Sequence, residues 1–205
     1  MQLFLKRATD LALSVPILLI AAPLMALCAL AIRIFMGSPV LFQQVRIGYK
    51  ERPFTLLKFR TMHEAVDSSI ALSTDAERLT PLGRWLRRTS LDELPQLWHV
   101  ITGEMSLVGP RPLLPQYLDR YTAVQRRRHE CKPGITGWAQ TQGRNSLSWE
   151  RKFELDVWYV DHCSFWLDVR ILLATAATVF RARDTSQAGH ATAPEFLGSK
   201  PESQE

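Results

Sequence analysis

The run of residues 11–32 contains no charged side chain and limits the possible folds more than any other stretch of the chain. It is long enough to be a candidate membrane helix. Lys6 and Arg7 precede the run and Arg33 follows it. The run has no polar face at helical period, which argues against a buried helix in a soluble core. We therefore expect the chain to associate with a membrane.

Two prolines inside this run, Pro16 and Pro23, bear on how it would sit in the membrane. A secretory signal peptide is disfavoured, because Leu27 before Cys28 makes a poor lipoprotein site and no small-x-small cleavage site follows. A straight spanning helix fits the length, but each proline removes a helical hydrogen bond. We favour a re-entrant hairpin that breaks at Pro23 and keeps both basic ends on the cytoplasmic side. The straight spanning helix is the alternative.

Composition narrows the class of protein and of partner. The 205 residues suffice for one domain with a core, and the net charge of +5 is basic. Basic charge suits phosphates, an anionic membrane surface or nucleic acid, but no nucleic-acid-binding pattern is present, so we expect no nucleic acid partner. The cysteines are odd in number and form no disulfide or zinc pattern, which indicates a reducing compartment. They are Cys28, Cys131 and Cys163.

Two short strands are predicted over residues 40–45 and 54–60, joined by a hairpin connection. Lys58 and Arg60 fall on one face of the second strand, because strand side chains alternate. This spacing predicts a small cationic face or, equally, a solvated strand edge.

The rest of the chain is predicted to be mainly helical, with a polar loop over residues 62–80. Residues 81–88 place Trp85 and Leu86 among basic side chains, which suits a membrane interface or a plain surface helix. The further predicted helices cover residues 113–130, 149–160 and 166–180.

The fold class that follows is α/β and helix-rich, with a small β-hairpin and interfacial amphipathic helices. We expect a re-entrant membrane helix over residues 1–36 and a compact cytoplasmic catalytic domain over 37–185. A partly disordered tail is expected over 186–205.

Two adjacent carboxylates, Asp92 and Glu93, follow a basic run at residues 84–88. Ser90 and Glu93 have the spacing of a capping box. Asp92 would then lie in the first helical turn, where free N–H groups and the helix dipole favour negative charge. We expect Asp92 to stay ionised at neutral pH, as suits a metal ligand or a nucleophile. The alternative is that these residues only cap a helix.

Other segments are candidates for phosphate binding. Arg111 lies between two prolines, which would present its guanidinium stiffly for bidentate phosphate recognition or simply form a turn. Residues 132–138 are glycine-bearing, and Gly143 precedes Arg144 and Asn145. Such loops could hold a nucleotide or diphosphate, or only turn the chain.

Several motifs follow one another from Lys6 to Gly198. They are Lys58-Phe59-Arg60-Thr61-Met62, Ser90-Leu91-Asp92-Glu93-Leu94, Gly109-Pro110-Arg111-Pro112, Lys132-Pro133-Gly134-Ile135-Thr136-Gly137-Trp138 and Asp156-x-Trp158-Tyr159-Val160. Together they resemble the bacterial sugar transferase family, and within it the small monotopic polyprenyl-phosphate phosphoglycosyl transferases. The chain looks like the minimal catalytic type, without the extra membrane domain of larger members.

The resemblance implies transfer of a phosphosugar from a UDP-sugar to undecaprenyl phosphate, with release of UMP. It also implies Mg²⁺ and a covalent aspartyl-phosphosugar intermediate, with Asp92 as nucleophile and metal ligand and Glu93 as its essential partner. The family's helix breaks at a Ser-Pro pair, where this chain has Ala22-Pro23. The substrate-binding residues expected here are Lys58, Arg60, Arg87, Arg111, Arg144, Asn145, His190 and Thr192.

The resemblance implies a location on the cytoplasmic face of the bacterial inner membrane. The implied partners are the lipids of the inner leaflet and downstream glycosyltransferases. The reaction would be the first membrane step of glycoconjugate synthesis, protein glycosylation included. Residues 189–192, Phe196 and Gly198 resemble the tail of members that use UDP-di-N-acetylbacillosamine. UDP-glucose, UDP-galactose and UDP-N-acetylhexosamine are the alternatives.

Two other functions fit the same residues. A membrane-bound phosphodiesterase would use Asp92 and Glu93 to activate water. A non-catalytic module would bind nucleotide or lipid phosphate at the membrane surface.

Overall fold

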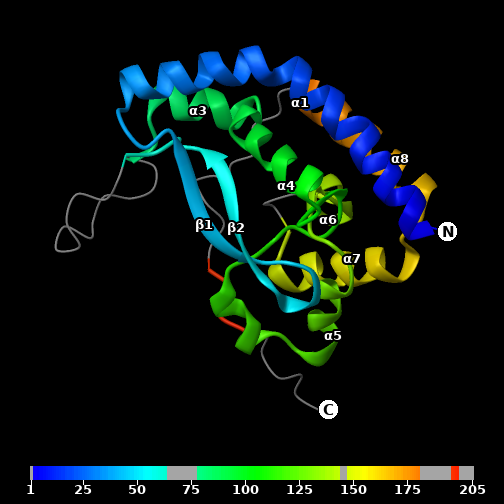
Figure 1. Cartoon of the computed structure of the whole chain (residues 1–205). Coiled ribbons are helices and arrows are strands. Elements are labelled where there is room, and N and C mark those ends of the chain that lie inside the picture. Colours follow the sequence, from blue (N-terminus) through cyan, green and yellow to red (C-terminus); the bar gives the residue numbers. More distant parts are fainter. Residues whose placement is uncertain (1, 64–77, 144–146, 181–194, 199–205) are drawn as a thin grey trace.

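The computed structural model describes residues 2–63, 78–143, 147–180 and 195–198. The described part is helix-rich, as predicted, with two small sheets. Helix α1 (Gln2–Phe35) lies along one side of the remaining elements, and the hairpin of β1 and β2 projects away from it (Figure 1). Most of the predicted loop at 62–80 lies outside the described residues.

The predicted hairpin is confirmed. Strand β1 (Leu41–Ile47) pairs antiparallel with β2 (Pro53–Phe59), and the short 3₁₀ turn η1 (Tyr49–Glu51) joins them. Residues directly opposite each other in such a pair share a face of the sheet. Phe42 lies opposite Lys58 and Arg46 opposite Phe54, so the register orders these side chains along one face.

A second, parallel sheet joins β3 (Ser106–Val108) to β4 (Gly134–Thr136). Its residues Leu107 and Val108 belong to the main core, which draws on the hairpin, α4 and the last two helices. The buried members of that core are Phe54, Leu56, Leu97, Val100, Met105, Leu107, Val108, Tyr159 and Ile171.

Most of the predicted helices are confirmed. The helical elements after the hairpin are α3 (Pro81–Arg88), η2 (Leu91–Gln96), α4 (Leu97–Thr102), η3 (Pro115–Arg120), α5 (Ala123–Arg126), η4 (Arg127–Glu130), α6 (Trp138–Gln142), α7 (Trp149–His162) and α8 (Phe165–Phe180). The 3₁₀ elements among them are η2, η3 and η4. Among the predicted segments, residues 81–88, 149–160 and 166–180 are helical as expected.

The single helix predicted over residues 113–130 is wrong. This segment forms short pieces, and Tyr121 between them is extended, with φ of −78° and ψ of 140°. The apolar residues Leu113, Tyr117 and Tyr121 do share an environment, but it is a small aromatic core completed by Phe153 and Phe196. Their four-residue spacing therefore imitated the periodicity of one amphipathic helix.

Helix α1 is continuous through Pro16 and Pro23. The predicted break into two separate helices is therefore not seen, although Figure 1 shows that the helix axis is bent. A proline inside a helix removes one hydrogen bond and kinks the axis without necessarily ending the helix. Re-entrant placement in a membrane stays a prediction.

The beginning of α1 is anchored to the domain by charged side chains. Lys6 donates to the carboxylate of Asp168 at 2.6 Å and to the carbonyl of Val108 at 2.9 Å. The carboxylate of Asp10 accepts from the Ser106 hydroxyl at 3.0 Å and from the Leu107 amide at 2.9 Å. These contacts attach the first turns of an apolar helix to strand β3.

The end of α1 is anchored by packing. Cys28 and Ile32 are buried in a cluster with Phe59 of β2 and Leu86 of α3. Both ends of α1 therefore rest on the same domain, while much of the side facing away from it is apolar and exposed. The exposed residues on α1 include Phe4, Leu19, Ile20, Leu27, Leu30, Ile34 and Phe35. Among the described residues, α1 is the one helix that is long and apolar enough to cross a membrane.

The anchoring of α1 can be tested with Lys6→Met. Asp168 would keep its hydrogen bond from Tyr159 but lose its cationic partner. We expect the free energy of unfolding in detergent micelles to fall by about 1–3 kcal/mol. Lys50→Met removes an exposed lysine and is the matched control. Equal stability of the two variants would contradict the anchoring role.

Candidate active site

The two adjacent carboxylates lie in the 3₁₀ turn η2, directly after α3. Ser90 precedes this turn in a left-handed conformation, with φ of +58°, and its side chain makes no capping hydrogen bond. The predicted capping box of Ser90 and Glu93 is therefore wrong. A non-glycine residue in this conformation is strained, and such strain often occurs where a chain must present a functional side chain. Here the residue presented two positions later is Asp92.

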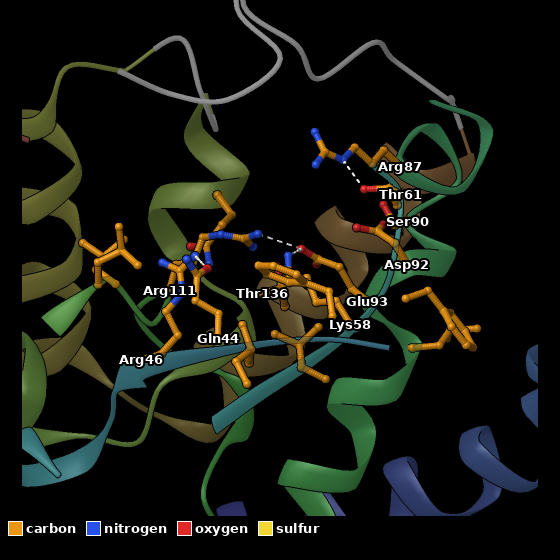
Figure 2. A pocket seen from close by; sticks show the side chains of 18 of the residues that line it. Gln44, Arg46, Lys58, Thr61, Arg87, Ser90, Asp92, Glu93, Arg111 and Thr136 are labelled. Atoms are coloured by element: carbon orange, nitrogen blue, oxygen red, sulfur yellow. Dashed lines mark hydrogen bonds and ion pairs between the residues drawn. The ribbon is translucent and has the colours of Figure 1, made fainter. Parts of the chain in front are cut away.

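Glu93 is held by two cations that come from distant parts of the chain. Its Oε1 atom accepts from Lys58 Nζ of β2 at 2.7 Å and from Arg111 Nη2 at 2.7 Å (Figure 2). Burial alone would raise the pKa of Glu93, but Arg111 and Lys58 hold that pKa well below its usual range. Glu93 therefore stays ionised and positions both cations.

Asp92 has a different environment although it is adjacent in sequence. It is 8% exposed, and within the described parts of the chain no donor hydrogen-bonds to its carboxylate. Burial, followed by the charge of Glu93, raises the pKa of Asp92 to about 6, and Lys58 and Arg87 offset part of that rise. Asp92 is still mostly ionised at pH 7, but the predicted dipole effect is not what sets its pKa.

Arg87 and Arg111 stand on either side of the carboxylates. Arg87 Nε, on α3, donates to the Thr61 hydroxyl at 3.0 Å, and both residues lie near Asp92 in Figure 2. Arg111 follows β3, and its guanidinium reaches Glu93. The structure therefore brings together five of the predicted catalytic and substrate-binding residues. They are Asp92, Glu93, Lys58, Arg87 and Arg111.

The backbone at Arg111 is held by a buried ion pair that sequence reasoning missed. Arg128 donates to the Arg111 carbonyl at 2.7 Å and to the Asp156 carboxylate at 2.7 Å. The side chains of Arg128 and Asp156 are 2% and 5% exposed. Arg128 belongs to a basic run at 126–128. The available signal for its pairing was the acidic residue that begins the Asp156 motif.

The glycines of residues 132–138 serve a close approach of two backbone segments. A Cβ atom on Gly134 would lie 2.1 Å from the Gly109 nitrogen, and one on Gly137 would lie 2.2 Å from the Gly109 oxygen. No side chain fits at such distances, so these glycines allow β4 to pack against the loop that carries Arg111. The structure thus gives these glycines a packing role that neither predicted role named, and a contact of this loop with a nucleotide stays a prediction.

Arg60 lies apart from the carboxylates. Its guanidinium donates to the carbonyls of Gly37 and Ser38, each at 2.8 Å, and also to that of Met36. Arg60 therefore fixes the link between α1 and β1 and does not form a joint cationic face with Lys58. A substrate contact by Arg60 stays a prediction.

Four other predicted substrate-binding residues lie outside the described residues. They are Arg144, Asn145, His190 and Thr192. Part of the predicted tail is described, however. Phe196 is 1% exposed and packs against Tyr117 and Phe153, while Glu195 pairs with Arg120 at 2.8 Å.

The carboxylates open into a cavity of about 2000 Å³. Basic side chains outnumber acidic ones in its lining, which suits an anionic substrate. Its lining also includes apolar side chains, among them Ile17 of α1 and Leu172 of α8.

Gln44 and Arg46 of β1 also line the cavity, and sequence reasoning missed both. The available signal was their spacing: Phe42, Gln44 and Arg46 are two residues apart and therefore lie on one face of the strand.

A family model described as bacterial sugar transferase matches residues 1–182. The chain belongs to this family. A sugar transferase of Bacillus subtilis named "Uncharacterized sugar transferase EpsL" is 52% identical over 96% of the chain, which covers 98% of that protein. The family assignment made from the motifs is therefore confirmed.

Two longer relatives in the family have more specific names. Undecaprenyl-phosphate glucose phosphotransferase of Komagataeibacter xylinus is 44% identical over 83% of the chain. UDP-glucose:undecaprenyl-phosphate glucose-1-phosphate transferase of Escherichia coli is 39% identical over 83% of the chain. The chain covers only 35% and 39% of these two proteins.

The raised pKa of Asp92 predicts a gain in stability for Asp92→Asn. Because the pKa is about 6 in the folded state and 3.8 as its ordinary value, the charge of Asp92 destabilises the fold above pH 6 and not below pH 4. We expect Asp92→Asn to raise the free energy of unfolding at pH 8 by on the order of 1–3 kcal/mol. The gain should shrink as the pH falls through 6 toward 4.

Denaturant unfolding in detergent micelles at pH 8 and pH 4.5 measures this effect. Asp119→Asn, at an exposed position, is the matched control and should change stability little at either pH. A loss of stability in Asp92→Asn at pH 8 would contradict the electrostatic description of the site.

Proposed function

We propose that this protein transfers a sugar 1-phosphate from a UDP-sugar to undecaprenyl phosphate and releases UMP. The observation that carries the proposal is the contrast between two neighbouring carboxylates. Glu93 is bound by two cations, whereas Asp92 is buried and accepts no hydrogen bond from the part of the chain that the structure describes. A buried, ionised and uncommitted carboxylate in a basic cavity suits attack on a phosphate. The names of the longer family members support the choice of donor and acceptor.

In the first step an oxygen of Asp92 attacks the β-phosphorus, the phosphorus that carries the sugar. A bond forms between that oxygen and phosphorus. The bond between the phosphorus and the oxygen bridging to the α-phosphate breaks, and UMP leaves with the electron pair. An anion attacks an anion here, so the charge must be neutralised by fixed cations. Lys58 and Arg111, already oriented by Glu93, are placed for this role, and Arg87 lies on the other side of Asp92.

In the second step a phosphate oxygen of undecaprenyl phosphate attacks the same phosphorus. A new diphosphate linkage forms, the bond to Asp92 breaks, and the Asp92 carboxylate is regenerated. An acyl phosphate is reactive enough for this transfer. Glu93 is a positioning residue in both steps, because both of its cationic partners are needed where negative charge accumulates.

Mg²⁺ belongs to this proposal. Among the described residues no three acidic, histidine or cysteine side chains converge on one point. Mg²⁺ commonly uses only one or two carboxylates together with substrate phosphates and water. Asp92 fits as that protein ligand, because no donor among the described residues binds its carboxylate. When bound, Mg²⁺ would neutralise part of the charge of the diphosphate.

We place the protein on the cytoplasmic face of the bacterial inner membrane, with α1 entering and leaving on that side. Support comes from the two ends of α1, which both rest on the same domain while apolar residues face outward. Trp85 of α3 and Trp98 of α4 are exposed, and tryptophan favours membrane interfaces. The long lipid of the acceptor would then reach the cavity from the membrane.

The sugar is a matter for experiment. Relatives are named for glucose and galactose, whereas the tail around Phe196 resembles members that use UDP-di-N-acetylbacillosamine. A panel of these donors and UDP-N-acetylhexosamines, with UMP release as the readout, identifies the substrate. The lipid-linked product would pass to downstream glycosyltransferases of a glycoconjugate pathway.

The covalent step can be tested without acceptor. Incubation with the accepted UDP-sugar should add the mass of one phosphosugar to the intact protein and release one equivalent of UMP. Asp92→Asn should give neither, and Asp119→Asn should behave like the natural chain. Continuous UMP release without an adduct would instead indicate a phosphodiesterase that activates water. Binding without any UMP release would indicate the non-catalytic module.

The topology can be tested by cysteine labelling in intact and permeabilised cells. Single cysteines at Gln2 and Gly37, after replacement of Cys28, Cys131 and Cys163, should both be labelled from the cytoplasmic side. A spanning helix would place them on opposite sides. Labelling on opposite sides would disprove the monotopic arrangement and leave the chemical proposal standing.

A further inference from the structure

Arg46 lines the cavity on the same strand face as Lys58 but at the other end of the hairpin. Phe42 lies opposite Lys58 and Arg46 opposite Phe54, so four residue steps separate the two positions along the strand. At the usual rise this is roughly 13 Å. Arg46 thus lies farther from α1 than Lys58, because β1 begins beside the end of α1 and runs away from it (Figure 1).

Arg46 carries a positive charge that no acidic side chain offsets within the described parts of the chain. Its Nη2 donates to Gln44 Oε1 at 2.6 Å, and its Nη1 makes a long contact of 3.4 Å with the Pro112 carbonyl. Its Nε is buried, and none of the described residues hydrogen-bonds to it. Burial, together with the nearby charge of Arg111, lowers the pKa of Arg46 to about 10. An arginine that lines a cavity and has no acidic partner among the described residues is suited to binding an anion.

The position of Arg46 relative to Asp92 indicates which anion. In Figure 2, Gln44, Arg46 and Arg111 lie at one end of the labelled residues, Asp92 at the other, and Lys58 with Glu93 between them. In a phosphoryl transfer the attacking and leaving oxygens are roughly in line through the phosphorus. A substrate attacked by Asp92 beside Lys58 and Arg111 therefore directs its leaving group toward Arg46.

We propose that Arg46, oriented by Gln44, binds the phosphate of the nucleotide that leaves. This inference rests on the proposed function and adds a binding residue to it. The α-phosphate would lie between Arg111 and Arg46, and the uridine would lie at the end of the cavity away from α1. That end suits a water-soluble product, whereas the lipid acceptor would approach from the side of α1.

The test measures ligand binding in the full chain carrying Asp92→Asn, which cannot turn over. Isothermal titration in lipid nanodiscs compares UMP, uridine and farnesyl phosphate. Adding Arg46→Gln should raise the Kd for UMP about 10- to 100-fold, the loss expected for a charge-assisted hydrogen bond. The Kd values for uridine and farnesyl phosphate should change less than about threefold. Arg46→Lys should recover part of the loss because it keeps the charge.

Arg52→Gln is the matched control, because Arg52 is exposed on the same hairpin and does not line the cavity. It should bind UMP as the parent does. An unchanged Kd for UMP in Arg46→Gln, or a parent that does not bind UMP, would overturn the proposal. An equal rise in the Kd for uridine would also overturn the proposal, because uridine has no phosphate. Arg46 would then affect binding indirectly, by holding the loop at Pro112. A loss confined to farnesyl phosphate would assign Arg46 to the acceptor and overturn it as well.

Failure of this inference is distinguishable from failure of the proposed function. Release of UMP from UDP-sugars by the chain with Asp92 intact tests the function. If UMP is released but its binding does not depend on Arg46, only the inference fails. If no UDP-sugar is turned over but UMP binding requires Arg46, the nucleotide phosphate site stands and the proposed reaction does not.

Discussion

The contact between Glu93 and its two cations joins parts of the chain on which the whole site depends. Lys58 comes from the hairpin, Glu93 from the turn after α3, and Arg111 from the loop after β3. None of these segments is near another in sequence, yet all meet at one carboxylate oxygen. Because the side chain of Glu93 is only 20% exposed, loss of either cation would leave its charge poorly compensated, and such losses are costly. The contact thus joins three segments around the cavity and fixes Lys58 and Arg111 beside one carboxylate oxygen.

This arrangement divides two adjacent acidic residues into different roles. Glu93 pairs with Lys58 and Arg111, while Asp92 accepts no hydrogen bond from the described residues and has a raised pKa. The burial that raises the pKa of Asp92 makes its charge a cost to stability. Asp92 and Glu93 are also supported indirectly, because the buried Arg128–Asp156 pair holds the backbone at Arg111. Positioning is thus achieved by buried polar contacts, which fix geometry more than they add stability.

Helix α1 illustrates how an apolar helix can be tied to a polar domain. Its first turns carry Lys6 and Asp10, whose charges are satisfied by groups around β3 and α8. Its last turns carry Cys28 and Ile32, which pack on the hairpin and α3. The cavity lining extends from Asp92 to Ile17 of this helix. The apolar helix α1 therefore forms part of the wall of the basic cavity that contains Asp92.

Much of this could be predicted from sequence because it depends on local spacing. The apolar run, the alternation of the hairpin and the helices at 81–88, 149–160 and 166–180 all follow from period and length. The predictions that were wrong are those in which local spacing imitated another structure. Ser90 and Glu93 had the spacing of a capping box, but Glu93 turns toward cations that are 35 and 18 residues away. Arg60 was predicted to bind substrate and Arg46 was not singled out, but backbone carbonyls occupy Arg60, while Arg46 has no acidic partner among the described residues. Sequence determined which charged groups this chain possesses, and only the tertiary structure decided which are paired, because pairing depends on contacts between segments that sequence spacing does not relate.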